Sequence, residues 1–269
     1  ILIRQKKMQK EEQLLEKHFI DLSRQAYHRN IITYSDFLNL NEQNILHSIP
    51  KDKLYTGFII FGGYDFAERQ MAAFIPDALS LRDVKDSGII SDIFQSELSV
   101  LHISPLNKKY SEALSHRDYL GSILNLGIER GMIGDILITD SEAIVFVKMQ
   151  MQEFLTENIT RIRHTSVLAT IDELTDFHYS PRYEEIKGTV ASVRLDSLLS
   201  VAFSSSRSKL SGLIEGGKVF VNGRLITSNA YQVKEHDIIS VRGMGKFEFI
   251  ETLAFTKKKR IYVLIHKYV

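Results

Sequence analysis

Residues 194–224 read RLDSLLSVAFSSSRSKLSGLIEGGKVFVNGR, and this stretch decides the fold of the last third of the chain. Its first part has apolar residues at positions i, i+3, i+4 and i+7, which is the spacing of a helix with one apolar face. These residues are Leu195, Leu198, Leu199 and Ala202. The same spacing leaves Arg194, Asp196 and Ser197 toward solvent.

A second helix is predicted after the three serines at 204–206, because serine side chains commonly cap the first turn of a helix. Its core-facing residues are Leu210, Leu213 and Ile214. The residues left outside or at its edges are Arg207, Ser208 and Lys209. Gly216 and Gly217 end this helix, since glycine tolerates the left-handed turn that a helix end requires.

Strands follow the two helices. Residues 218–221 and 224–226 flank Asn222-Gly223, which is the strongest two-residue signal for a β-hairpin. Two later strands are expected at residues 237–241 and 246–253, joined across residues 242–245. The last third is therefore predicted to be a small α+β domain.

The charge of the chain is unevenly distributed. Residues 187–269 hold 14 Lys and Arg against 6 Asp and Glu, whereas residues 1–186 hold 20 against 27. The last third is therefore basic and the rest of the chain is acidic. A basic domain of this kind attracts polyanions, above all nucleic acid. The alternative is that these cations form an ordinary solvated surface.

Composition excludes several other classes of protein. The chain has no Cys, so it has neither a disulfide framework nor a thiolate zinc site, and its nine His lack ligand-like spacing. This argues against a metal site, and we also expect no cofactor and no catalytic residues. No apolar run is long enough to cross a bilayer and no signal-peptide pattern opens the chain, so a cytoplasmic protein is expected.

The first two thirds read as helices followed by alternating strands and helices. Residues 15–26 and 34–47 are predicted to be helical, the second starting at Ser35-Asp36. Strands are expected at 55–61, 70–75, 98–103, 135–139, 143–148 and 167–171, with helices at 110–126 and 150–158. From residue 98 the order is βαββαβ, that of a ferredoxin-like unit, which RNA-recognition motifs also use. The aromatic motif that stacks bases in such motifs is absent from the candidate central strands.

The predicted fold class is α+β with three parts. Residues 1–53 form an N-terminal helical region, residues 54–181 a ferredoxin-like (RRM-like) middle domain, and residues 182–269 the basic C-terminal domain.

The C-terminal motifs resemble the S4 RNA-binding domain. RLDSLLS, the S-R helix, GKVFVNG and HDIISVRG match the pattern of that family in order. The resemblance implies RNA contacts by Arg194, Ser206, Arg207 and Lys209, with weaker candidates at Lys218, Asn222, Arg224, Arg242 and Lys246. Asn222 and Gly223 have the alternative role of forming the turn.

The whole chain resembles the YlmH family of bacterial S4-domain proteins, through the run HRDYLG at residues 116–121 and the segments NLG and IGDI that follow. The resemblance implies a monomeric, ribosome-associated factor that binds 23S rRNA of the large subunit and peptidyl-tRNA, in quality control of stalled nascent chains. His116 and Arg117 are a possible second RNA contact. Alternatively, Arg117 and Asp118 cap the helix and pair locally. Glu68-Arg69 is read as a pair at a strand edge.

Two other classes of function stay open. An RNA-modifying enzyme of the pseudouridine synthase type needs a catalytic Asp in a separate domain, yet the one RLD motif, at residues 194–196, belongs to the RNA-binding helix. A cell-division scaffold would depend on the acidic first two thirds instead.

The basic run at residues 257–260 is expected at a hairpin tip, where it either binds phosphate or is solvated.

Overall fold

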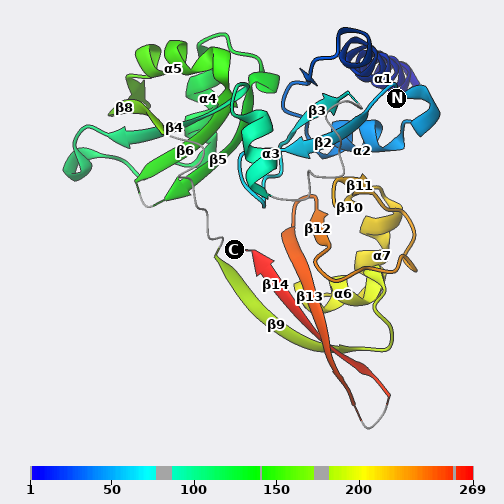
Figure 1. Ribbon diagram of the computed structural model, residues 1–269. Helices are drawn as coiled ribbons and strands as arrows, with labels where there is room; N and C mark the ends of the chain where they lie inside the picture. The colour runs from blue at the N-terminus through cyan, green and yellow to red at the C-terminus, as the bar shows by residue number, and fades with distance from the viewer. Residues whose placement is uncertain (1, 77–86, 140, 173–181, 257–258, 269) are drawn as a thin grey trace. The chain divides into compact units, whose positions relative to one another are not determined.

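The structure is a computed structural model that describes residues 2–76, 87–139, 141–172, 182–256 and 259–268 (Figure 1). The chain folds as two compact units, Ile1–Tyr179 and Ser180–Val269. Among the described residues, no helix is long and apolar enough to span a membrane.

The first unit begins with a small sheet under two helices. The sheet has the order β1-β3-β2, with β1 at Thr33–Tyr34, β2 at Gly57–Phe61 and β3 at Met71–Ile75. Helix α1, Leu2–Arg29, buries Phe19 and Ala26 in one cluster with Leu46 of α2, Leu40–Ser48. This sheet contains strands from both sides of the domain boundary predicted near residue 54, because β1 precedes that residue and β2 and β3 follow it. An independent domain at residues 54–181 stays a prediction.

The start predicted for α2 was wrong. Tyr34 belongs to β1, and the helix begins at Leu40 instead of near Ser35. Asn39 caps it by accepting bonds from the backbone N–H groups of Asn41 and Glu42, while the Glu42 side chain accepts from the N–H of Asn39 at 2.7 Å. This reciprocal cap satisfies N–H groups that have no partner inside the helix.

The second sheet of this unit confirms the ferredoxin-like order. Its strands run β5-β6-β4-β8-β7, and all neighbouring pairs are antiparallel. The strands are β4 at Leu98–Pro105, β5 at Ile133–Thr139, β6 at Glu142–Lys148, β7 at Arg161–Ile162 and β8 at Thr165–Asp172. Helices α4, His116–Asn125, and α5, Gln152–Asn158, lie on one side of it (Figure 1).

Helix α4 starts later than predicted. Residues 108–110 form a separate 3-10 turn, and α4 begins at His116 instead of Tyr110. The reason is a second reciprocal cap, in which the backbone N–H of Ser115 donates to the Asp118 carboxylate at 2.8 Å. Apolar spacing alone does not reveal where such a cap interrupts the helix.

The other face of this sheet is partly covered by the N-terminal region. Val100 and Phe146 on this face are fully buried against Phe37, Tyr64 and Phe94. Phe94 ends α3, Ser87–Phe94, a helix that was not predicted from the sequence. The N-terminal region and the ferredoxin-like sheet therefore share one core.

The second unit packs two helices on one face of a six-stranded antiparallel sheet of order β11-β10-β12-β13-β14-β9 (Figure 1). The helices are α6 at Leu195–Phe203 and α7 at Arg207–Glu215. The strands are β9 at Tyr183–Val190, β10 at Val219–Val221, β11 at Arg224–Leu225, β12 at Ile238–Val241, β13 at Gly245–Phe255 and β14 at Ile261–Tyr268. This arrangement agrees with the predicted α+β class.

Strand β9 was not predicted from the sequence. It pairs with β14 along its whole length, from Tyr183 with Tyr268 to Val190 with Ile261. Its core-facing positions include Gly188, where a Cβ atom would lie 2.5 Å from Val201 of α6. A glycine at this close approach weakens the apolar alternation by which strands are recognised.

Candidate RNA-binding surface

Arg194 lies at the N-cap position of α6 and is held by a carboxylate. Its guanidinium donates to both oxygens of Asp196, from Nε at 3.1 Å and from Nη2 at 3.2 Å. Asp196 is only 7% exposed, so this two-point contact fixes the orientation of the arginine. The Arg194 side chain is itself partly exposed.

Asp196 and Ser197 were expected to face solvent, and the structure corrects this: both are buried. A later segment covers this side of α6, because the backbone N–H of Leu195 donates to the carbonyl of Tyr231 at 2.9 Å and that of Asp196 to Asn229 at 3.3 Å. Helical periodicity identifies the face that packs on the sheet, but it does not reveal a second covering segment from elsewhere in the chain.

The first turn of α7 brings together three of the predicted residues. Ser206 is the N-cap residue, although its hydroxyl lies 3.3 Å from Ser208 Oγ and makes no capping bond. Lys209 is exposed, and Arg207 is the first helical residue, with a side chain outside the described set. A helix start with unbonded N–H groups and nearby cations suits phosphate. The nine residues of α6, about 13 Å long at the usual helical rise, separate this turn from Arg194.

Lys218, Arg242 and Lys246 lie on the opposite face of the sheet. The residues that alternate with them, Val219, Val241 and Phe247, point toward the helices. The Arg242 guanidinium lies 5.4 Å from the ring centre of Phe220, and Lys246 Nζ lies 5.6 Å from that of Tyr268. The predicted RNA contacts therefore divide into a helix group, Arg194, Ser206, Arg207 and Lys209, and a sheet group, Lys218, Arg242 and Lys246.

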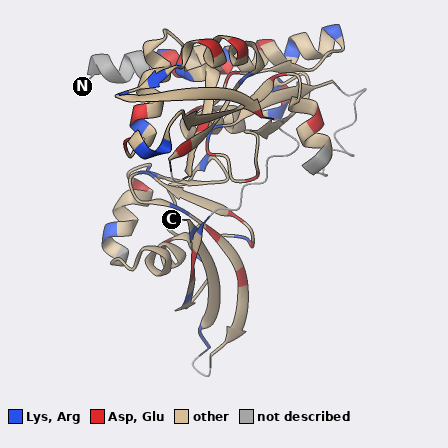
Figure 2. Ribbon diagram, turned by 90° about the vertical axis from the view of Figure 1, so that its left-hand side faces the viewer, with Lys and Arg blue, Asp and Glu red and all other residues tan. Residues whose placement is uncertain are grey.

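Other predicted residues lie apart from both groups. Arg224 is exposed on the edge strand β11. Within the basic run, residues 257–258 lie outside the described set, and Arg260 Nη2 donates to the carbonyl of Thr189 at 2.7 Å. Figure 2 shows that the basic residues of this unit occur on both helices and strands, so charge alone does not select one face.

Asn222 serves the fold directly. Asn222 and Gly223 have φ values of 47° and 76°, as a tight hairpin turn requires. The Asn222 amide donates to Asp237 Oδ1 at 2.8 Å and accepts from the N–H of Ile238 at 2.9 Å. These bonds join the turn to the start of β12.

Replacing Asn222 with alanine is expected to lower the free energy of unfolding of the second unit by about 2 kcal/mol, because the left-handed backbone and both amide bonds are affected. Urea unfolding followed by circular dichroism measures this change. Asn222→Gly keeps the backbone conformation and should recover part of the loss. Unchanged stability together with weakened RNA binding would instead assign Asn222 to the RNA surface.

The second predicted contact, at the start of α4, includes a structural cap. Asp118 accepts from Ser115 and lies 3.5 Å from Arg163 Nη1, and these bonds to Ser115 hold its pKa below the ordinary value. Arg117 is exposed. Desolvation, aided by the positive charge of Arg130, lowers the pKa of His116. At neutral pH the His116 side chain is therefore uncharged, and it can form hydrogen bonds but not an ion pair.

Arg69 is not paired with Glu68 as predicted. Its side chain donates to the carbonyls of Phe37 at 2.8 Å, Ile133 at 3.0 Å and Arg130 at 3.2 Å. Asp135 complements it by accepting from the backbone N–H of Arg69 at 3.1 Å. This network joins the N-terminal region to β5, and no local pattern in the sequence signals it.

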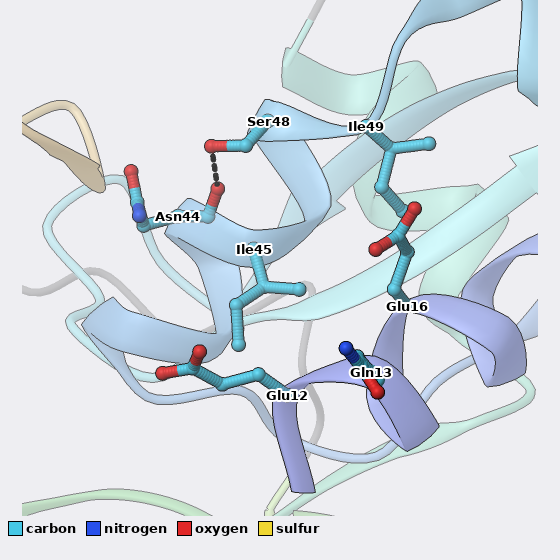
Figure 3. Close-up of a pocket in the computed structure, with 7 residues that line it drawn as sticks. All are labelled: Glu12, Gln13, Glu16, Asn44, Ile45, Ser48 and Ile49. Carbon is cyan, nitrogen blue, oxygen red and sulfur yellow. Dashed lines mark hydrogen bonds between the residues drawn. The ribbon is translucent and has the colours of Figure 1, made fainter. Parts of the chain in front are cut away.

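The hollow between α1 and α2 does not suit RNA. It has a volume of about 430 Å³, and the acidic side chains of Glu12 and Glu16 line it (Figure 3). On its other side the Ser48 hydroxyl donates to the carbonyl of Asn44 at 2.7 Å. Carboxylates at the rim repel phosphate, so we assign no RNA contact here.

Comparison with known families agrees with these observations. Residues 94–176 match the model described as "Putative RNA-binding domain in YlmH", and residues 193–239 match the S4 domain. The chain is 27% identical over 230 residues to the ribosome-associated protein quality control protein P2 of Bacillus subtilis, covering 84% of this chain and 83% of the relative. The cell division protein ylmH from Streptococcus pneumoniae aligns with a TM-score of 0.47 and 22% identity, over 62% of this chain and 93% of that one.

The helix group therefore belongs to an S4 domain, and the ferredoxin-like sheet belongs to a second RNA-binding domain. Together they define an RNA-binding protein with two RNA-binding domains in one chain. The two domain matches and the similarity along most of the chain make this chain similar to YlmH-type proteins. Arg242 and Lys246 lie beyond the matched S4 residues.

Proposed function

We propose that this protein is a non-catalytic factor that binds rRNA and tRNA on the large ribosomal subunit, as a monomer in the cytoplasm, during quality control of stalled nascent chains. The observation that carries the proposal is the helix group, which sets cations around two helix starts on the S4 domain. The printed name of the Bacillus subtilis relative supports a ribosomal partner.

The arrangement of Asp196 argues against the pseudouridine synthase alternative. A catalytic carboxylate must reach its substrate, but Asp196 is buried and both its oxygens accept from Arg194. The RLD motif is therefore used to orient an arginine at the start of α6. RNA binding is the activity that this geometry supports.

Co-sedimentation of the full chain with purified large and small ribosomal subunits tests the proposal. Phosphate contacts make affinity fall steeply with salt, so the measurement is made at about 50 mM and about 200 mM salt. We expect pelleting with large subunits that weakens at the higher salt, and stronger pelleting when they carry peptidyl-tRNA. Equal pelleting with small subunits would indicate general RNA binding, and no pelleting with either would favour the cell-division scaffold.

A further inference from the structure

The face by which ferredoxin-like domains commonly bind RNA is largely unsuitable here. RNA-recognition motifs stack bases on the outer face of their two central strands, which correspond to β4 and β6. Phe146 on β6 is fully buried, and its ring stacks on Tyr64 with centres 5.1 Å apart. An aromatic ring enclosed in this way is not accessible to a base.

The uncovered part of that face carries an internal ion-pair network. His102 Nε2 and Lys108 Nζ each lie 2.7 Å from a carboxylate oxygen of Glu142. The hydrogen bonds from Lys108 and His102 hold the pKa of Glu142 below its ordinary value, so the carboxylate is charged at neutral pH. The charge of Lys108 is therefore balanced by Glu142, and this pair has no net charge to attract a phosphate backbone.

Next to this face, two loops are joined into one surface. The segment after β4, residues 106–112, is bonded to β7 and the start of β8, residues 161–166: the N–H of Leu106 donates to the Ser166 carbonyl at 3.0 Å. Glu112 receives the N–H of His164 at 3.2 Å, and its own N–H donates to Thr165 Oγ1 at 3.1 Å. These two segments are called the loop edge below.

The loop edge combines cations with exposed apolar side chains. Its described charged residues are Lys108, Lys109, Arg161 and Arg163 against Glu112. Tyr110 is 75% exposed and Leu106 is 66% exposed, higher values than any other large apolar side chain described in the first unit. Lys109 Nζ lies 5.7 Å from the ring centre of Tyr110, which places a cation beside the exposed ring.

We propose that the domain of residues 94–176 takes unpaired RNA on the loop edge, with Tyr110 stacking on a base and Lys109, Arg161 and Arg163 contacting phosphates. Exposed rings among cations are the usual way of holding single strands. A continuous duplex hides the faces of its bases, so a stacking ring selects unpaired or terminal nucleotides. The proposal rests on the RNA-binding function proposed above and names the class of RNA for this domain.

Fluorescence anisotropy of the full chain tests this proposal, with a single-stranded RNA on the order of ten nucleotides and a duplex of the same sequence. Tyr110→Ala should weaken single-strand binding by about tenfold and leave duplex binding unchanged. Tyr110→Phe keeps the stacking ring and should bind like the wild type. Phe154→Ala is the matched control, because Phe154 is also exposed but lies on α5 of the same domain.

Unchanged single-strand binding by Tyr110→Ala would overturn the proposal, as would an equal loss for the duplex. Displacement of the RNA by an acidic peptide with higher affinity would overturn it in favour of a protein partner. A wild-type chain that binds the single strand but does not pellet with ribosomes would contradict the ribosomal function alone. The two proposals therefore fail by different results.

Discussion

Replacing Arg207 and Lys209 together with glutamate is expected to abolish binding to the large ribosomal subunit at about 200 mM salt. Both residues lie in the first turn of α7, where two positive charges become two negative charges beside the proposed phosphate contacts. The fold should be preserved, because carboxylates are favourable at a helix N-terminus. Co-sedimentation measures the loss, and circular dichroism checks that the variant is folded.

Two further double variants test whether the loss of binding is specific to the first turn of α7. Lys10→Glu with Lys17→Glu changes the net charge equally on the exposed surface of α1, and it should bind like the wild type. Lys218→Glu with Arg242→Glu alters the sheet group instead. Loss of binding in this last variant, with the α7 variant unaffected, would move the RNA surface of the S4 domain to the sheet face.

The largest expected effect on stability comes from Gly63→Ala. Gly63 has φ +100°, and a Cβ atom there would overlap the ring of Phe146, which is fully buried. Backbone strain and overpacking together should lower the free energy of unfolding of the first unit by about 3 kcal/mol or more. Urea unfolding followed by circular dichroism should show an earlier transition of this unit, with that of the S4 domain unchanged.

Gly121→Ala is the control for this change. Gly121 lies within α4, and a Cβ atom there meets nothing within 4 Å. Alanine should therefore stabilise the helix by about 0.5–1 kcal/mol. An unfolding midpoint of Gly63→Ala equal to that of the wild type would show that the Phe146 ring moves aside without cost, and would contradict the tight packing described here.

The sequence alone predicted the parts of the fold that depend on local patterns. The βαββαβ order from residue 98 indicated the ferredoxin-like sheet, since alternation of strand and helix restricts how the strands pair. Asn222-Gly223 marked a hairpin because a two-residue turn requires left-handed backbone at both positions. The spaced motif of residues 194–224 located the S4 domain, which the match to residues 193–239 confirms.

Elements that depend on distant partners escaped prediction. Strand β9 has Gly188 where an apolar residue would mark the core face, because α6 approaches there. Asp196 was expected at the surface but is covered by the segment that contains Tyr231. Arg69 bonds to carbonyls 32 or more residues away, and nothing in its local sequence shows this. Hydrogen bonds between distant segments leave no periodic trace.

The sequence by itself determined the class of the protein, because both RNA-binding domains are specified by motifs and by the order of elements along the chain. Only the tertiary structure decided which surfaces remain for RNA. It places the helix group and the sheet group on opposite faces of one sheet. It also buries Phe146 and leaves Tyr110 exposed to solvent. Whether a side chain is accessible depends on what packs over it, and that packing arises from residues far apart in the chain.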